Sequence, residues 1–193
     1  MTEVIPPNEE ATVVMDGAAM AETLRRLARE IVNDNPDLER LALLGILRRG
    51  RPLADRLAGL IGKMTGLTPP VGSLATTLYR DDFRSGLGSP KAKGSTHFDF
   101  NVDDRTILLV DDVLAAGRTI RAAMDEVMDY GRPRRIQLAC LVDRGGRELP
   151  IQADYLGHSM ATEPCEWVTA RLVEIDGEDA VLLTRREPAG DSV

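Results

Sequence analysis

Residues 106–119 constrain the fold of this chain more than any other stretch. Residues 107–110 form a continuous apolar run, which is typical of a strand covered on both faces in a parallel sheet. Asp111 and Asp112 follow where we expect that strand to end, and residues 114–118 then turn through two alanines and a glycine. Thr119 lies at the start of the next expected helix. The pattern predicts an α/β fold whose ligand side lies at the carboxyl ends of its strands.

The residue types in this stretch indicate what such a site can bind. Small side chains let backbone N–H groups approach an anion closely, and a helix that starts there adds the positive end of its dipole. Two carboxylates beside such a phosphate cup can accept hydrogen bonds from a sugar diol. The combination predicts a site for a phosphoribosyl group. The predicted contact residues are Asp111, Asp112, Val113, Leu114, Ala115, Ala116, Gly117, Arg118 and Thr119.

The spacing alone leaves an alternative open, namely a strand-to-helix connection that binds nothing. Asp and Gly are ordinary turn residues, so an acidic pair before a glycine turn is a weak signal. The two common nucleotide-binding patterns, GxxxxGK[ST] and GxGxxG after a strand, are both absent.

A second polar loop follows the buried strand expected at residues 41–47. Arg48 and Arg49 come directly after that strand, and Gly50 permits a strained turn. Arginine offers several N–H donors to a polyanion, so we assign this loop to pyrophosphate, with Arg49 as the main ligand. Arg80 lies in a stretch rich in Gly, Ser and Lys, residues 80–100, which we interpret as a flexible hood that excludes water from the reaction.

The rest of the chain fits one domain. The 193 residues contain 43% hydrophobic and 28% charged residues, which are ordinary globular values, and the net charge is −7. We predict an irregular N-terminal arm at residues 1–15, one domain at 16–185 and a tail at 186–193. Periodicity and capping residues predict a helix that Asp16 caps and that runs to about residue 33, a helix from Pro52 that Gly66 ends, and a helix from Thr119. They also predict strands at 71–79, 136–142 and 153–156, and a C-terminal β-hairpin around residues 176–179. Trp167 begins that hairpin, and we assign it to packing. The absence of a long apolar run and of a signal peptide predicts a soluble cytoplasmic protein.

Several stretches together carry a family resemblance. Residues 110–114 with Gly117-Arg118-Thr119 resemble the phosphoribosyl-pyrophosphate motif of type I phosphoribosyltransferases. Thr77-Leu78-Tyr79-Arg80-Asp81-Asp82, Gly131-Arg132-Pro133 and Leu141-Val142-Asp143-Arg144-Gly145, followed by residues 147–151, narrow the match. Over about residues 16–183 the chain resembles the pyrimidine-operon attenuation regulators that are also uracil phosphoribosyltransferases.

The resemblance implies a parallel-sheet type I phosphoribosyltransferase fold with a mobile hood. It implies transfer of the phosphoribosyl group from phosphoribosyl pyrophosphate to uracil, giving UMP and pyrophosphate, with Mg²⁺ as cofactor. Asp111 and Asp112 then hold the ribose hydroxyls and contact the metal only indirectly, while Arg49 and Arg80 neutralise the pyrophosphate. The base lies near Arg144, Leu156 and His158. Family members form homodimers or higher oligomers, and many bind leader RNA of pyrimidine operons when UMP or UTP is bound.

The sequence also departs from the family pattern. Ala115 and Ala116 replace a usual Tyr-Thr pair, which removes a hydroxyl from the phosphate loop, and Arg48 replaces a threonine. Gly146, Gln152 and His158-Ser159 replace histidine, arginine and Lys-Asn, so cations that can contact RNA phosphates are missing. The alternative function is a nucleotide-sensing RNA-binding attenuator with weak or lost catalysis. A phosphoribosyltransferase for another base, such as a purine, is a third reading.

Overall fold

The computed structural model describes residues 11–75 and 95–185. Arg80, most of the predicted hood, residues 1–10 and the tail at 186–193 lie outside the described residues. Within the described ranges, every helix is too short or too polar to cross a lipid bilayer.

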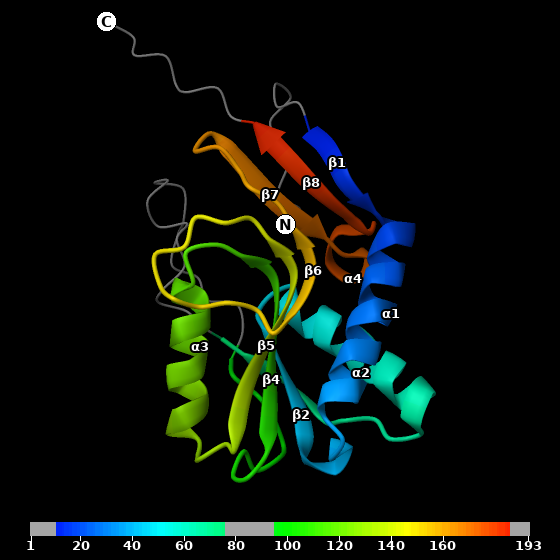
Figure 1. Ribbon diagram of the computed structural model, residues 1–193, viewed down its shortest axis with the longest axis vertical. Coiled ribbons are helices and arrows are strands. Elements are labelled where there is room, and N and C mark those ends of the chain that lie inside the picture. The colour runs from blue at the N-terminus through cyan, green and yellow to red at the C-terminus, as the bar shows by residue number, and fades with distance from the viewer. Residues whose placement is uncertain (1–10, 76–94, 186–193) are drawn as a thin grey trace, which may run out of the picture.

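A five-stranded sheet forms the centre of the molecule (Figure 1). Its strands lie in the order β3-β2-β4-β5-β6, and every neighbouring pair is parallel. The strands are β2 (Leu41–Ile46), β3 (Val71–Leu74), β4 (Thr106–Leu114), β5 (Arg135–Asp143) and β6 (Tyr155–Ser159). All six residues of β2 are buried, as are residues 107–110 of β4. The prediction of a parallel α/β sheet from these apolar runs is confirmed.

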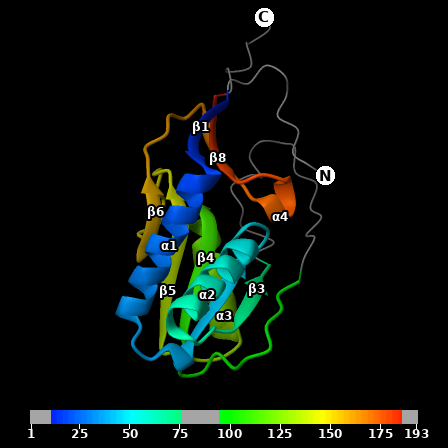
Figure 2. The same cartoon turned by 90° about the vertical axis from the view of Figure 1, so that its right-hand side faces the viewer.

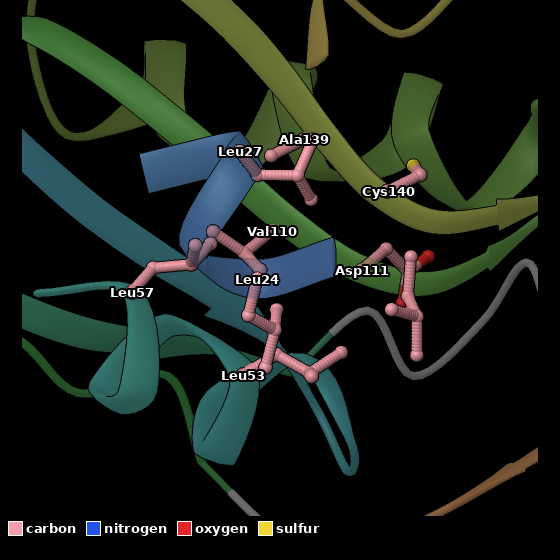
Figure 3. A pocket seen from close by; sticks show the side chains of 9 residues that line it. Leu24, Leu27, Leu53, Leu57, Val110, Asp111, Ala139 and Cys140 are labelled. Carbon is pink, nitrogen blue, oxygen red and sulfur yellow. The ribbon is translucent and has the colours of Figure 1, made fainter. Parts of the chain in front are cut away.

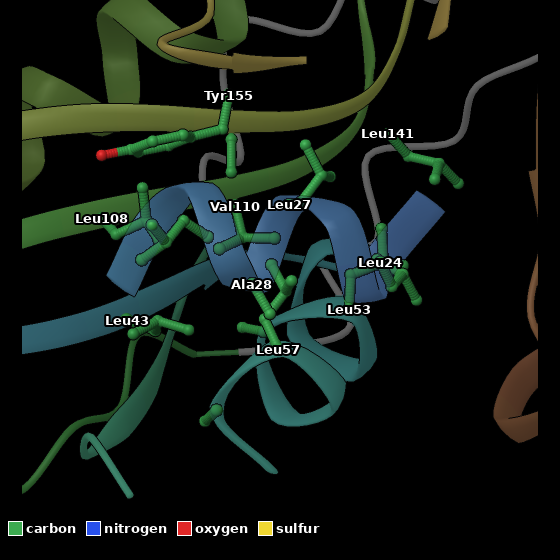
Figure 4. Packing of buried hydrophobic residues seen from close by; sticks show 14 of the residues in the cluster. Leu24, Leu27, Ala28, Leu43, Leu53, Leu57, Leu108, Val110, Leu141 and Tyr155 are labelled. Carbon is green, nitrogen blue, oxygen red and sulfur yellow. The ribbon is translucent and has the colours of Figure 1, made fainter. Parts of the chain in front are cut away.

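Helices cover both faces of this sheet (Figures 1 and 2). Helices α1 (Gly17–Asp34) and α2 (Gly50–Thr65) pack on one face, where Leu108 and Val110 of β4 join their cluster (Figure 4). Helix α3 (Arg118–Asp129) packs on the other face, against Ile107 and Leu109. Successive residues of a strand point to opposite faces, so one apolar run supplies both cores.

The ends of α1 and α2 follow their local sequence. Asp16 is the N-cap of α1, and its Oδ1 accepts a hydrogen bond from the Ala19 N–H at 2.8 Å. Gly66 ends α2 with φ +79°, a conformation that glycine adopts without the steric cost of a Cβ. Both ends agree with the prediction from sequence.

A second sheet of three antiparallel strands lies beyond the carboxyl ends of the parallel strands (Figure 1). It consists of β1 (Ala11–Asp16), β8 (Ala180–Arg185) and β7 (Glu166–Arg171), in that order. Strands β7 and β8 are the predicted hairpin, although a short helix, α4 (Val173–Asp176), lies between them. The prediction of an irregular arm was wrong for residues 11–15, because these residues pair with β8 as strand β1.

Three further details differ from the sequence prediction. Strand β3 ends at Leu74, because its neighbour β2 ends at the paired residue Ile46. Strand β6 begins only at Tyr155 and continues to Ser159, because the longer β5 offers pairing partners up to Asp143. The side chain of Trp167 is only partly packed, with 38% of its surface exposed.

Candidate active site

The loops after β2 and β4 diverge at the carboxyl edge of the parallel sheet. Strand β2 pairs with β4 up to Gly45 and Val110, whereas β4 continues beside β5 to Leu114. The chain leaves β2 toward β3 on one side and leaves β4 toward β5 on the other. Such a switch point is where open α/β sheets bind their ligands.

Asp111 and Asp112 lie within β4. The sequence had suggested that the strand ends before them. The strand continues because Asp111 still pairs with Cys140 and Leu114 with Asp143 of β5. Adjacent strand residues point to opposite faces, so the two carboxylates have different surroundings. Asp112 is half-buried, whereas Asp111 is 8% exposed and its Oδ1 accepts the Asp112 N–H at 3.0 Å.

A small cavity lies between the sheet and helices α1 and α2, and Asp111 is among the residues that border it (Figure 3). Apart from Asp111, the lining residues are apolar residues and Cys140. The lining residues are Leu24, Leu27, Leu53, Leu57, Val110, Asp111, Ala139, Cys140 and Leu141. Burial, followed by the negative charges of Asp111, Asp112 and Asp143, raises the pKa of Cys140, so that thiol stays protonated. The cavity is therefore part of the core and does not resemble a site for a charged sugar phosphate.

The loop between β4 and α3 has the backbone arrangement of an anion site. The carbonyl of Leu114 accepts the Arg144 N–H at 3.0 Å, and that of Ala116 accepts the N–H groups of Glu148 and Leu149, each at 3.1 Å. The Ala115 carbonyl accepts from the Arg147 guanidinium at 2.6 Å. The C=O and N–H bonds at the two ends of a trans peptide point in opposite directions. The N–H groups of residues 115–117 therefore point away from the 144–149 segment.

Those N–H groups are available for a ligand. Within the described ranges, the N–H groups of Ala115, Ala116 and Gly117 donate to no protein acceptor. Gly117 has φ +91° and precedes the first turn of α3, whose free N–H groups and dipole add to the same positive region. Thr119 is half-buried in that turn, and exposed Arg118 forms an ion pair with Glu148. The sequence had predicted this combination of loop and helix.

The loop after β2 leads directly into the start of α2, which lies close to Val110 in β4. The Leu47–Arg48 peptide bond is cis, and Arg48 is exposed. A Cβ on Gly50 would lie 2.2 Å from the carbonyl oxygen of Val110, so only glycine lets the start of α2 approach β4 this closely.

Arg49, the predicted pyrophosphate ligand, is bound within the protein. Its Nε and Nη2 donate to the two carboxylate oxygens of Asp176 at 3.2 and 3.0 Å, and the Asp176 side chain is 7% exposed. Burial alone would raise the pKa of Asp176, but the hydrogen bonds from Arg49 and from the Leu172 N–H outweigh burial and lower it. Asp176 is therefore ionised at neutral pH, and it holds the loop after β2 against the second sheet.

Among the residues predicted to surround the base, Arg144 follows β5 and His158 lies near the end of β6, whereas Leu156 is the second residue of β6. His158 is exposed and pairs with Val142, and half-buried Arg144 donates to the Thr162 hydroxyl at 3.4 Å. The carbonyl of Leu156 accepts from Arg26 of α1 at 3.0 Å. Arg144 and His158 therefore lie on the same edge of the sheet as the loop between β4 and α3, and the contact of all three residues with the base stays a prediction.

Magnesium remains a prediction. The described residues contain no group of three or more His, Cys, Asp or Glu side chains that could bind an ion by themselves. Half-buried Asp112 offers carboxylate oxygens at the open edge of the sheet, and Mg²⁺ commonly binds one or two carboxylates together with phosphate oxygens and water. The residues present therefore fit an ion that is held mainly by a bound pyrophosphate.

Sequence reasoning had assigned no role to Arg147 or Asp176. Arg147 contacts the loop between β4 and α3 directly, and its spacing of four from Asp143, with which it forms an ion pair, was the available signal. Asp176 lies 127 residues from Arg49, and no local pattern indicates that they pair.

Comparisons with known proteins agree with this geometry. The family model for the phosphoribosyl transferase domain matches residues 11–169. The chain is 47% identical to "Bifunctional protein PyrR" of Clostridioides difficile over 90% of this chain and 98% of that protein. It is 49% identical to the protein of that name from Thermus thermophilus, over 91% and 97%.

Solved structures share the fold at much lower identity. The HGPRT-ase of Leishmania tarentolae in complex with GMP gives a TM-score of 0.68 at 17% identity, covering 92% of this chain and 97% of that one. The hypoxanthine phosphoribosyltransferase of Trypanosoma cruzi gives 0.65 at 14% identity, covering 91% and 97%. At such identities the likeness shows the fold alone.

Proposed function

The chain belongs to the phosphoribosyl transferase domain family and, within it, to the bifunctional PyrR proteins, and from this we propose that it transfers a phosphoribosyl group from phosphoribosyl pyrophosphate to uracil. The products are UMP and pyrophosphate. The observation that carries the proposal is the row of N–H groups at residues 115–117, which lies beside Asp112 at the carboxyl edge of the sheet.

The phosphate loop binds the 5′-phosphate of the substrate. Ala115 and Ala116 have no hydroxyl, so the anion is bound by backbone N–H groups, by the start of α3 and by Thr119. Asp112 accepts hydrogen bonds from the ribose hydroxyls. Asp111 is buried behind it, and its Oδ1 orients the Asp112 backbone.

The leaving pyrophosphate lies over the loop after β2. Exposed Arg48 contributes a cation there, whereas Arg49 shares its charge with Asp176. Arg80, outside the described residues, is the second predicted cation. Magnesium, when bound with the substrate, neutralises charge that develops on the pyrophosphate oxygens.

The chemistry asks the protein mainly for position and charge balance. Uracil N1 bonds to the anomeric carbon as the bond from that carbon to the pyrophosphate oxygen breaks. The proton of N1 is transferred to solvent. Arg144, Leu156 and His158 border the space for uracil, and no nucleophilic side chain is required. We place the protein in the cytoplasm and expect a homodimer or a higher homo-oligomer.

A panel of bases with labelled phosphoribosyl pyrophosphate tests this function. We expect UMP from uracil with Mg²⁺ present, and at least 10-fold slower transfer to hypoxanthine, guanine and adenine, a discrimination that positioned base contacts supply. Equal or faster phosphoribosyl transfer to a purine would support the third reading of the sequence, a phosphoribosyltransferase for another base. No transfer to any base would reject the enzymatic proposal.

RNA binding is the second candidate function, favoured by the word "bifunctional" in the names of the relatives. In this chain the exposed positions Gly146, Gln152, His158 and Ser159 carry no permanent cation, and the net charge is −7. We therefore expect UMP- or UTP-dependent binding of pyrimidine leader RNA to be weak. Gel shifts with the cognate leader, with and without UMP, decide this. Nanomolar binding of the leader RNA, combined with no phosphoribosyl transfer to any base, would favour the alternative function of an RNA-binding attenuator.

A further inference from the structure

The position of Arg147 points to a task within the proposed reaction. The segment 144–149 donates hydrogen bonds to three successive carbonyls of the phosphate loop, those of Leu114, Ala115 and Ala116. The first and third bind backbone N–H groups, which any sequence supplies. The second binds the Arg147 guanidinium, which is the only contribution to this set that depends on a side chain.

Arg147 is itself held in place on three sides. Its Nε donates to the Ile151 carbonyl at 2.7 Å, its Nη1 to the Ala115 carbonyl at 2.6 Å, and its Nη2 forms an ion pair with Asp143 at the end of β5. The Arg147 and Asp143 side chains are 23% and 19% exposed. A guanidinium presents its N–H groups in a fixed plane, so these partners together define where it lies.

The orientation of one peptide unit follows from this arrangement. The carbonyl of Ala115 and the N–H of Ala116 belong to the same trans peptide and point in opposite directions. Because Arg147 holds the carbonyl, it turns the Ala116 N–H toward the anion site. Ala115 and Ala116 have no side-chain donor, so phosphate binding depends on the directions of these backbone groups.

We propose that Arg147 is a positioning residue that sets the phosphate loop for the 5′-phosphate without touching the substrate. This inference rests on the proposed function. It makes the selectivity for a phosphorylated ligand depend on a guanidinium on the opposite side of the loop, with Asp143 as its anchor.

The test compares UMP with uridine, because the two differ only in the 5′-phosphate. Dissociation constants for both ligands, measured by calorimetry, give the preference of each variant for the phosphate. In Arg147→Ala we expect the preference for UMP over uridine to fall by about 10-fold to 100-fold, the effect of misaligning one charge-assisted hydrogen bond. The KM for phosphoribosyl pyrophosphate should rise by about the same factor. Uridine binding and the KM for uracil stay within about 2-fold. Added guanidinium ion restores part of the loss in Arg147→Ala.

Arg105→Ala is the matched control. Arg105 precedes the same strand, β4, and its Nη1 also donates to a backbone carbonyl, that of Glu39 at 3.0 Å, but at the amino edge of the sheet. Its loss should leave the preference for UMP unchanged. If Arg147→Ala fails to fold, Arg147→Lys decides, because it keeps the charge but loses the planar fork.

The outcomes separate the two proposals. Wild-type protein that binds UMP no better than uridine contradicts the proposed function. Wild-type protein that prefers UMP, together with an Arg147 variant that keeps this preference, overturns only the positioning role. An equal loss of UMP and uridine binding in the variant would also overturn it, because that result indicates general damage.

Discussion

At the scale of single residues, the two aspartates of β4 differ in spite of their identical chemistry. Asp111 is 8% exposed and accepts its neighbour's N–H, whereas Asp112 is half-buried at the open edge. We therefore predict that Asp112→Asn lowers kcat/KM for phosphoribosyl pyrophosphate by about 10-fold to 100-fold, the cost of one charged hydrogen bond or more. Asp111→Asn keeps an acceptor oxygen and should mainly reduce stability, by about 1 kcal/mol.

Steady-state kinetics and urea unfolding of both single variants check this prediction, with Asp125→Asn as control. Asp125 is exposed on α3, and among the described residues its ion pair is with Arg121 at 2.6 Å, so its change should alter neither quantity much. Full activity in the double variant Asp111→Asn/Asp112→Asn would rule out the assignment of the ribose hydroxyls to this pair.

What the sequence reveals at this scale depends on how local a contact is. The loop between β4 and α3 could be predicted because its alanines, Gly117 and Thr119 are adjacent in the chain. The different burial of Asp111 and Asp112 could not, since it depends on β5 pairing with β4 up to Leu114. The pairing of Arg49 with Asp176, 127 residues away, could not be predicted from a local sequence pattern either.

At the scale of elements, the start of α2 is fixed by how closely it approaches β4. A Cβ on Gly50 would lie 2.2 Å from the Val110 carbonyl oxygen, which is backbone and cannot move aside. We predict that Gly50→Ala costs about 3 kcal/mol or more, at the upper end of overpacking effects. The shift of α2 would also displace Arg48 and Arg49, so activity should fall with stability.

Gly59 in the same helix is the matched control. A Cβ there meets no atom within 4 Å, and the residue is exposed. Gly59→Ala should stabilise the protein by about 0.5–1 kcal/mol, because alanine loses less backbone freedom on folding. Urea unfolding curves of the two variants check both signs, and equal effects at both positions would contradict the steric argument.

Elements with strong periodicity were predicted from sequence, and elements that depend on remote partners were not. Helix α1 has Met20, Leu24, Leu27 and Ile31 on one face and an aspartate cap, so its limits followed from the chain alone. Strand β1 was missed because its partner β8 begins at Ala180, far along the chain. Helix α4 has only four residues, too few for a periodic signal.

At the scale of the whole molecule, ion pairs join the second sheet to the parallel-sheet unit. Arg56 of α2 donates to Glu174 at 2.6 Å and to Asp179 at 2.7 Å, beside the pair of Arg49 and Asp176. Apolar contacts support the same junction, since Ala170, Leu172 and Val181 belong to the core cluster of α1 and α2. The junction therefore has a part that depends on pH and a part that does not.

The pH-dependent part has a definite sign. The hydrogen bond from Arg56 lowers the pKa of Glu174, and hydrogen bonds from Arg56 and the Val173 N–H outweigh burial to lower that of Asp179. A carboxylate whose pKa is lower in the folded state stabilises the fold above its unfolded pKa of about 4. That stabilisation is lost as the pH falls through the folded value. Acid should therefore loosen the second sheet first.

Trp167 on β7, the only tryptophan of the chain, reports on this sheet. We predict that lowering the pH from about 7 to 3 changes the Trp167 fluorescence before helix content falls, because Glu174, Asp176 and Asp179, whose pKa values the fold lowers, lie at this junction. Arg56→Met removes both pairs and should destabilise the protein at neutral pH by about 1–3 kcal/mol, an effect that shrinks in acid. Fluorescence and circular dichroism recorded together during acid titration check this order. Simultaneous loss of both signals in the wild type, with an Arg56→Met effect that does not depend on pH, would mean that apolar packing alone holds the second sheet in place.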